Sequence, residues 1–177
     1  MTTDCTGQRF LFQGPARREI VAAFDGGQMS SDGGLPLLRE VDLRRRILER
    51  FAQCFDDGRA PGQVEHSVQD LVRQRVYALA AGYEDLNDPQ ELRSDPLLSA
   101  AVAKSDPTGA ERSRERDRSK PLAGKSTLNR LEWGEAGSAG VDRYRRIAVE
   151  AEAVDRFFAE LFLDAHDEPP EEIVLDL

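Results

Sequence analysis

Arginine residues are the side chains of this 177-residue chain whose types and spacing most directly suggest chemistry. Two groups lie on consecutive stretches that we expect to be helical. If the polar faces of those helices join, their guanidinium groups would form a surface that can follow a phosphate backbone. The alternative is a solvated helix face with acid–base pairs such as Glu40–Arg44. The candidate contacts are Arg44, Arg45, Arg46, Arg50, Arg73 and Arg75, with Lys125 and Arg130 as a second group.

The Gly-Lys-Ser-Thr sequence at residues 124–127 contains the Gly-Lys-Ser that ends the phosphate-binding P-loop pattern. The full pattern requires glycine five residues before Gly124, and this chain has Ser119 there. The motif also follows a charged stretch rather than an expected strand. We therefore predict a local structural role, in which Ser126 caps a helix that begins at Thr127.

Metal-ligand patterns are weak in this sequence. His66 and His166 are far apart, and neither has a second soft ligand at the usual spacing. The acids of residues 83–88 could hold a divalent cation through their oxygens. A solvated helix junction, with Asp88 capping the next helix, is the simpler interpretation. Cys54, next to Phe55 on an expected helix, is predicted to be a core thiol rather than a nucleophile.

Charge and composition indicate a cytoplasmic protein without a membrane segment. The net charge is −9, from 24 basic and 33 acidic residues, which argues against unselective polyanion binding by the whole chain. Most of the negative charge falls in residues 141–177, so local basic faces remain possible in the earlier part. The sequence has no apolar run of about 20 residues, which excludes a spanning helix. Its two cysteines are too few for a disulfide framework.

Hydrophobic periodicity predicts a mainly α-helical chain with a short strand near its start. The strand covers residues 19–24, after a loose lead-in over residues 1–17. The clearest helix begins after Ser67, where Ser67 and Asp70 resemble a capping box, and stops near Gly82. Residues 104–124 read as a charged flexible loop. We expect a further helical stretch that follows capping side chains at residues 30–32 and runs through about residue 57, with a break around Asp42. Other helices are expected over residues 89–93, 96–103, 127–133 and 141–166.

Several short segments, in a fixed order, carry a resemblance to a known family. They are Phe-Asp-Gly-Gly at residues 24–27, Ser-Ser-Asp-Gly-Gly at 30–34, Gly-Tyr-Glu-Asp-Leu-Asn-Asp at 82–88, Leu-Arg-Ser-Asp-Pro-Leu at 92–97, Leu-Ala-Gly-Lys-Ser-Thr-Leu-Asn-Arg-Leu-Glu at 122–132 and Ile-Val-Leu-Asp-Leu at 173–177. With these landmarks the chain resembles the N-terminal part of a bacterial insertion-sequence transposase of the thirteen-eighty group of DDE enzymes. The resemblance covers most of residues 18–177.

The resemblance implies transfer of DNA by an RNase H-like nuclease domain. In that family three carboxylates hold two Mg²⁺ ions, which activate water or a 3′-hydroxyl for attack on a phosphodiester. The family's catalytic aspartate is expected just beyond Leu177, so Asp176 is only a stand-in for the first acid. The chain would then be a truncated front part that holds no metal and is inactive alone. Its last residues, 171–177, would be the first strand of the nuclease domain.

The expected organisation follows from these elements. Residues 18–103 form a helical DNA-binding region, residues 125–170 form a helical connector, and residues 171–177 begin the nuclease domain. The expected function is binding of double-stranded transposon-end DNA, with a homodimer or intact transposase as a further partner. Alternatives are a helical protein–protein interaction module that uses helix 141–166, a non-functional remnant, and an inhibitory truncated transposase.

Overall fold

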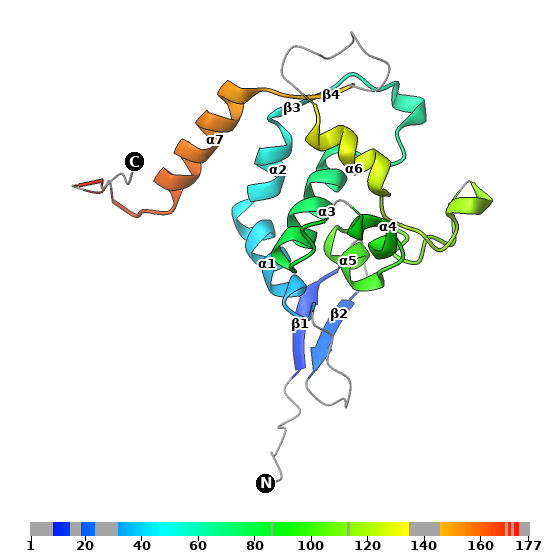
Figure 1. The fold of residues 1–177 in the computed structure, drawn as a ribbon. Helices are drawn as coiled ribbons and strands as arrows, with labels where there is room; N and C mark the ends of the chain where they lie inside the picture. The colour runs from blue at the N-terminus through cyan, green and yellow to red at the C-terminus, as the bar shows by residue number, and fades with distance from the viewer. Residues whose placement is uncertain are drawn as a thin grey trace.

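The structure is a computed structural model that describes residues 9–14, 19–23, 32–85, 87–112, 114–134, 146–168, 170 and 172–173. Among these residues, about half are helical and two small antiparallel sheets complete a mixed α/β fold (Figure 1). The helices are α1 (Leu35–Arg45), α2 (Ile47–Ala52), α3 (Val68–Ala80), α4 (Asp88–Leu92), α5 (Pro96–Ala101), α6 (Lys125–Glu132) and α7 (Ala151–Asp164). The strands are β1 (Arg9–Gln13), β2 (Glu19–Ala23), β3 (Phe55–Asp57) and β4 (Ile147–Val149), and short 3₁₀ turns occur at Pro61–Gln63 and Glu115–Asp117.

Helix α3 lies at the centre of the helical core. The predicted capping box is confirmed, because Ser67 Oγ accepts from the Asp70 backbone N–H and the Asp70 carboxylate accepts from the Ser67 N–H. Leu71 and Val72 of its apolar face are fully buried, and α2, α5 and α6 pack around it. The capping box therefore fixes where α3 begins, and burial of its apolar face stabilises the helix.

The break in the first long helix falls at Arg46 rather than around Asp42. Arg46 adopts a left-handed conformation, with φ of 53°, which ends α1 and starts α2. Asp42 instead lies inside α1 with 4% exposure. Its carboxylate accepts from the Leu48 backbone N–H at 2.7 Å and from the Tyr77 hydroxyl at 3.0 Å. Burial, followed by the charge of Asp42, raises the pKa of Tyr77.

Each of the two small sheets differs in part from the sequence prediction. The predicted strand at residues 19–24 is confirmed as β2 over its described part, but the lead-in is not wholly loose, because β1 pairs with β2 in antiparallel register, Arg9 opposite Ala23. The Arg39 guanidinium of α1 donates to the Gln13 carbonyl and ties this sheet to the helices. The expected helix to residue 57 was wrong at its end, where β3 pairs with β4, Phe55 opposite Val149.

The predicted helix over residues 141–166 is shorter than expected. Its described part begins with β4, and only Ala151–Asp164 is helical, as α7. Gly134 permits the close packing at β4, because an added Cβ there would overlap the Ile147 carbonyl oxygen. The Val149 N–H also donates to the Gly134 carbonyl at 3.3 Å, and the pairing of β4 with β3 replaces the helical pattern in this segment.

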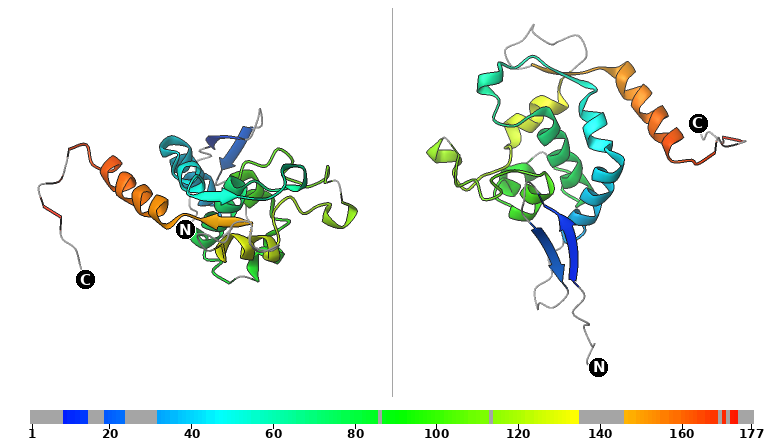
Figure 2. Two further views of the ribbon diagram at one scale, coloured as in Figure 1. Left: turned by 90° about the horizontal axis from the view of Figure 1, so that it is seen from above. Right: turned by 180° about the vertical axis from the view of Figure 1, so that it is seen from behind.

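Helix α7 lies beside α2 with much of its surface uncovered. Phe157 is buried against Phe51, with ring centroids 5.3 Å apart, whereas Phe158 and Leu163 are 56% and 59% exposed. Figure 2 shows that α7 and the segment with the 3₁₀ turn Glu115–Asp117 project on opposite sides of the helical core. Within the described residues we find no helix long and apolar enough to cross a membrane. Cys54 is buried, as predicted, and burial raises the pKa of its thiol.

Candidate nucleic-acid interface

Two adjoining hollows of about 470 and 560 Å³ lie where residues 104–124, the charged stretch, meet the start of α6. We call them together the basic groove. Its walls carry seven cationic side chains and only two acidic ones. The cationic residues are Arg59, Arg93, Arg112, Arg114, Arg116, Lys120 and Arg130, and the acidic residues are Glu65 and Asp117. On a chain of net charge −9, this groove is a local concentration of positive charge that suits an anionic ligand.

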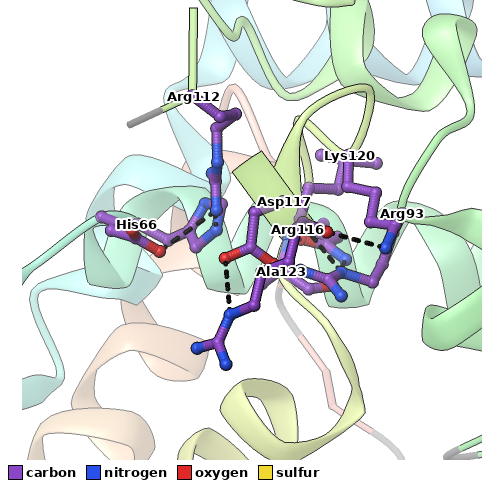
Figure 3. A network of polar contacts seen from close by, with 10 residues as sticks. His66, Arg93, Arg112, Arg116, Asp117, Lys120 and Ala123 are labelled. Carbon is purple, nitrogen blue, oxygen red and sulfur yellow. Dashed lines mark hydrogen bonds and ion pairs between the residues drawn. The ribbon is translucent and has the colours of Figure 1, made fainter. Parts of the chain in front are cut away.

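Asp117 anchors the charged stretch to the helical core (Figure 3). The buried carboxylate accepts from Arg93 Nη2 at 3.0 Å, and Arg116 Nε lies 3.6 Å away. Burial opposes ionisation of Asp117, but the hydrogen bond and charge of Arg93 outweigh it and lower the carboxyl pKa below its ordinary value. Lys120 Nζ donates to the Arg116 carbonyl at 2.9 Å. The stretch is therefore fixed at these points rather than fully solvated as expected.

A second anchor joins Arg112 to the loop before α3. Arg112 Nη2 lies 3.1 Å from Glu65 Oε2, and Arg112 Nη1 lies 3.1 Å from His66 Nε2. A guanidinium group only donates, so His66 Nε2 accepts and the proton of the neutral ring lies on Nδ1. Burial, with the charges of Lys104 and Arg112, lowers the pKa of His66 to about 3. His66 is thus a neutral imidazole in a strongly cationic wall.

This pKa predicts a specific loss of stability in mild acid. Because the folded protein takes up the His66 proton only near pH 3, whereas the unfolded chain takes it up near 6.5, stability falls as the pH drops below about 6.5. His66→Gln is expected to flatten the dependence of the unfolding free energy between pH 7 and 5.5. Urea unfolding at several pH values measures it. An unchanged slope in the variant would show that His66 does not carry the effect.

The wall of the groove at α6 is held by a buried clamp from α3. Gln74 Nε2 donates to the Ala123 carbonyl at 2.8 Å, and the Ala123 N–H donates back to Gln74 Oε1 at 2.9 Å. Both residues are almost fully buried. An added Cβ on Gly124, the next residue, would lie 3.1 Å from atoms of Arg93 and Gln90. Glycine at this position therefore lets Arg93 pass beside the start of α6.

The predicted contacts on α3 are held inside the fold. The Arg73 side chain is 15% exposed, and its Nε lies 3.3 Å from Asp42 Oδ2. The Arg75 side chain is 12% exposed, pairs with Glu132 and also donates to the Tyr83 carbonyl at 3.3 Å. With so little of either side chain exposed, these pairs leave little guanidinium surface for a phosphate.

The predicted contacts on α1 and α2 are more exposed, but acids accompany them. Arg44 pairs with Glu40 at 3.2 Å, and Arg46 pairs with Glu49. Arg50 reaches α7, where Asp164 and Glu160 lie 2.6 and 3.1 Å away, and Arg45 donates to the Asp164 carbonyl. The joint basic face expected from sequence is thus interrupted by carboxylates. Of all the predicted contacts, only Arg130 lines the basic groove, since Lys125 instead contacts Asn87.

The basic residues that line the groove are visible in the sequence, but not as part of a helix. Residues 111–120 hold five basic residues, but they lie in a stretch without helical periodicity and were interpreted as a loop. Their partners in the groove, Arg59, Arg93 and Arg130, come from three other segments. Only the fold brings these segments together.

The acidic candidates form no metal site in the part of the chain that the structure describes. There, no group of three or more His, Cys, Asp and Glu side chains is arranged to hold a metal ion. Asp85 accepts from the Asn87 N–H at 2.8 Å, which lowers its pKa, and Asp88 is the first residue of α4 rather than its cap. Asp176 lies outside the described residues. We therefore derive no metal-dependent step from these residues.

Comparison with known proteins gives one family. The family model described as transposase DDE domain group 1 matches residues 12–177, nearly the whole chain. No curated protein and no solved structure matches this chain.

Proposed function

The chain belongs to the family of transposase DDE domains, group 1, and from this membership we propose that it acts in transposition by binding DNA through the basic groove. The observation that carries the proposal is the excess of cationic over acidic side chains in a hollow built from four separate segments. Nucleic-acid phosphates are the anions a transposase must handle, and arginine is the side chain best suited to them. The finer proposal is that the DNA is a transposon end of an insertion sequence of the thirteen-eighty group.

Within the groove, Arg114 and Arg116 are the most accessible candidates for phosphate contact. Both side chains are exposed, and among the described residues no ion pair or hydrogen bond involves the Arg114 side chain. Arg93 and Arg112 are largely buried and paired, so we assign them to holding the wall in place. We propose that Arg44 and Arg46, which lie outside the groove, attract the DNA through their charge but do not fix where it binds. DDE transposases normally use Mg²⁺, and we assign binding rather than metal-dependent chemistry to the described region.

Arg114→Ala is expected to weaken binding to double-stranded DNA by about three- to tenfold, because one charge-assisted phosphate contact is lost. The matched control is Arg118→Ala, which removes an exposed arginine of the same stretch that does not line the groove. Fluorescence anisotropy with a labelled duplex at fixed salt measures both affinities. Equal affinities for the two variants would contradict a role of the groove in DNA binding.

The exposed face of α7 supports a second function, a protein-interaction module. Phe158, Phe162 and Leu163 leave apolar surface uncovered on a helix that contacts the core mainly through α2. Sedimentation at dilute concentration separates the two functions. A tight dimer without DNA affinity favours the module, and a monomer that binds duplex favours the groove.

A further inference from the structure

Trp133 is the single tryptophan of the chain, and it lies exposed at the end of α6. It is the C-cap residue of this helix and is 65% exposed, whereas Leu128 and Leu131 of α6 are buried. The helix begins at Lys125, so Ser126 lies inside it and the predicted cap by Ser126 was wrong. Packing of the core therefore accounts for the leucines of α6 but not for the large aromatic ring at its end.

Helical spacing places Trp133 on the face of α6 that lines the basic groove. Ser126, Arg130 and Trp133 follow one another at intervals of four and three residues, which puts them on one side of the helix. Ser126 lines the smaller hollow, and Arg130 lines both. Trp133 lies about 4.5 Å further along the helix axis than Arg130. The wall that α6 gives to the groove therefore continues to the indole ring.

The far wall of the groove also reaches this place, because α6 ends beside β4 (Figure 1). Gly134, the residue after Trp133, packs against the backbone at the start of β4. Arg146 immediately precedes β4 and is exposed, and its carbonyl accepts from the Gly58 N–H at 2.7 Å. The next residue, Arg59, lines the larger hollow. Trp133 thus lies between the groove and a further arginine.

The surroundings of Trp133 suit a nucleobase better than an apolar protein surface. The other exposed residues of α6 are all polar, so the ring does not belong to an apolar patch of this helix. An aromatic ring beside a cationic groove is the arrangement that binds unpaired nucleotides, with the base on the ring and the phosphates along the cations. A base within a duplex has both faces stacked already. The matching ligand is therefore a base without a pairing partner.

We propose that Trp133 stacks on an unpaired base of a DNA strand whose phosphates lie in the basic groove. This inference rests on the proposed function and adds to it a preference for a duplex that carries a single-stranded extension. Every base has an aromatic face, so the stacking selects an unpaired base without selecting its identity.

Trp133→Ala is expected to weaken binding of a duplex with a short single-stranded extension by about tenfold, within the range for one stacked base. The affinity for the same duplex with blunt ends should change by less than about twofold, because it offers no unpaired base. Trp133→Phe keeps an aromatic face and should retain most of the affinity. The control Leu37→Ala removes another exposed apolar side chain, which lies on α1 and is 60% exposed. Fluorescence anisotropy at fixed salt measures all four proteins.

The fluorescence of Trp133 gives a second measurement that needs no variant. Because no other tryptophan is present, quenching of the emission reports directly on a base stacked against this ring. The extended duplex is expected to quench it. An extension of abasic sugars keeps the phosphates but removes the bases, and it should neither quench the emission nor bind more tightly than the blunt duplex.

Three results would overturn the stacking site. They are an equal loss of affinity for blunt and extended duplexes in Trp133→Ala, equal quenching by normal and abasic extensions, and protection of Trp133 from acrylamide in the DNA-free protein that disappears on dilution. The last would assign the ring to a contact between two copies of the chain.

Failure of the stacking site can be distinguished from failure of the groove. If Trp133→Ala bound both DNAs like the wild type while Arg114→Ala still weakened duplex binding, the groove function would stand and only the stacking site would fail. A wild-type chain that bound neither DNA would contradict both.

Discussion

Asp42→Ala is expected to lower the free energy of unfolding by about 3–5 kcal/mol, the range for breaking a buried ion pair by removing one partner. The carboxylate is 4% exposed and serves three groups. These are the Leu48 N–H at 2.7 Å, the Tyr77 hydroxyl at 3.0 Å and Arg73 Nε at 3.3 Å. Alanine would leave the arginine charge and both polar groups without this acceptor. Urea unfolding followed by circular dichroism measures the change.

Tyr77→Phe is the control for this prediction. It removes only the hydroxyl and keeps the ring, so a loss of about 1 kcal/mol is expected. If Asp42→Ala cost no more than Tyr77→Phe, the carboxylate would not join α1, α2 and α3 as the contacts indicate.

Gln74→Leu is expected to cost about 2–5 kcal/mol, because the Ala123 N–H and carbonyl would both lose their buried partner. Leucine keeps most of the side-chain volume, so the change isolates the two hydrogen bonds. The clamp also holds the segment that leads into α6. We therefore expect weaker binding of duplex DNA by the variant at a temperature where it is still folded. Unfolding curves and anisotropy titrations give the two quantities.

Gln74→Met separates hydrogen bonding from side-chain shape. Methionine is unbranched like glutamine and makes neither bond, so it should be destabilised about as much as leucine. A Gln74→Met variant with wild-type stability would mean that the branching of leucine, and not the lost clamp, causes the defect.

Local signals in the sequence were sufficient for part of the fold. The capping box at Ser67 and Asp70 and the prolines of α4 and α5 act within a few residues, and these helices were predicted with small errors at their ends. The break in the first long helix was predicted around Asp42 but falls at Arg46, because arginine carries no sequence marker for the left-handed conformation. The pairing of β3 with β4 was missed, since three-residue strands far apart in the chain are fixed by tertiary contacts.

The candidate site was harder to predict than the fold. Clustering of arginines on consecutive helices pointed to α1, α2 and α3, but acids pair with them. Some of these acids are local, as in the Glu40–Arg44 pair that the sequence offered as the alternative, and others are distant in sequence. Arg50 meets Asp164 of α7, and Arg75 meets Glu132 of α6. Charge counts cannot show such pairing. The groove, in contrast, collects cations from a stretch without periodicity, so only folding reveals them as one surface.

The central claim is that the basic groove binds the DNA backbone, and the salt dependence of duplex affinity tests it most directly. Each phosphate neutralised adds about −0.9 to the slope of log affinity against log salt concentration. The account predicts that the triple variant Arg114→Ala, Arg116→Ala and Arg130→Ala has a slope shallower by about two to three than the wild-type chain. A wild-type chain with a slope near zero, or a triple variant with an unchanged slope, would contradict it.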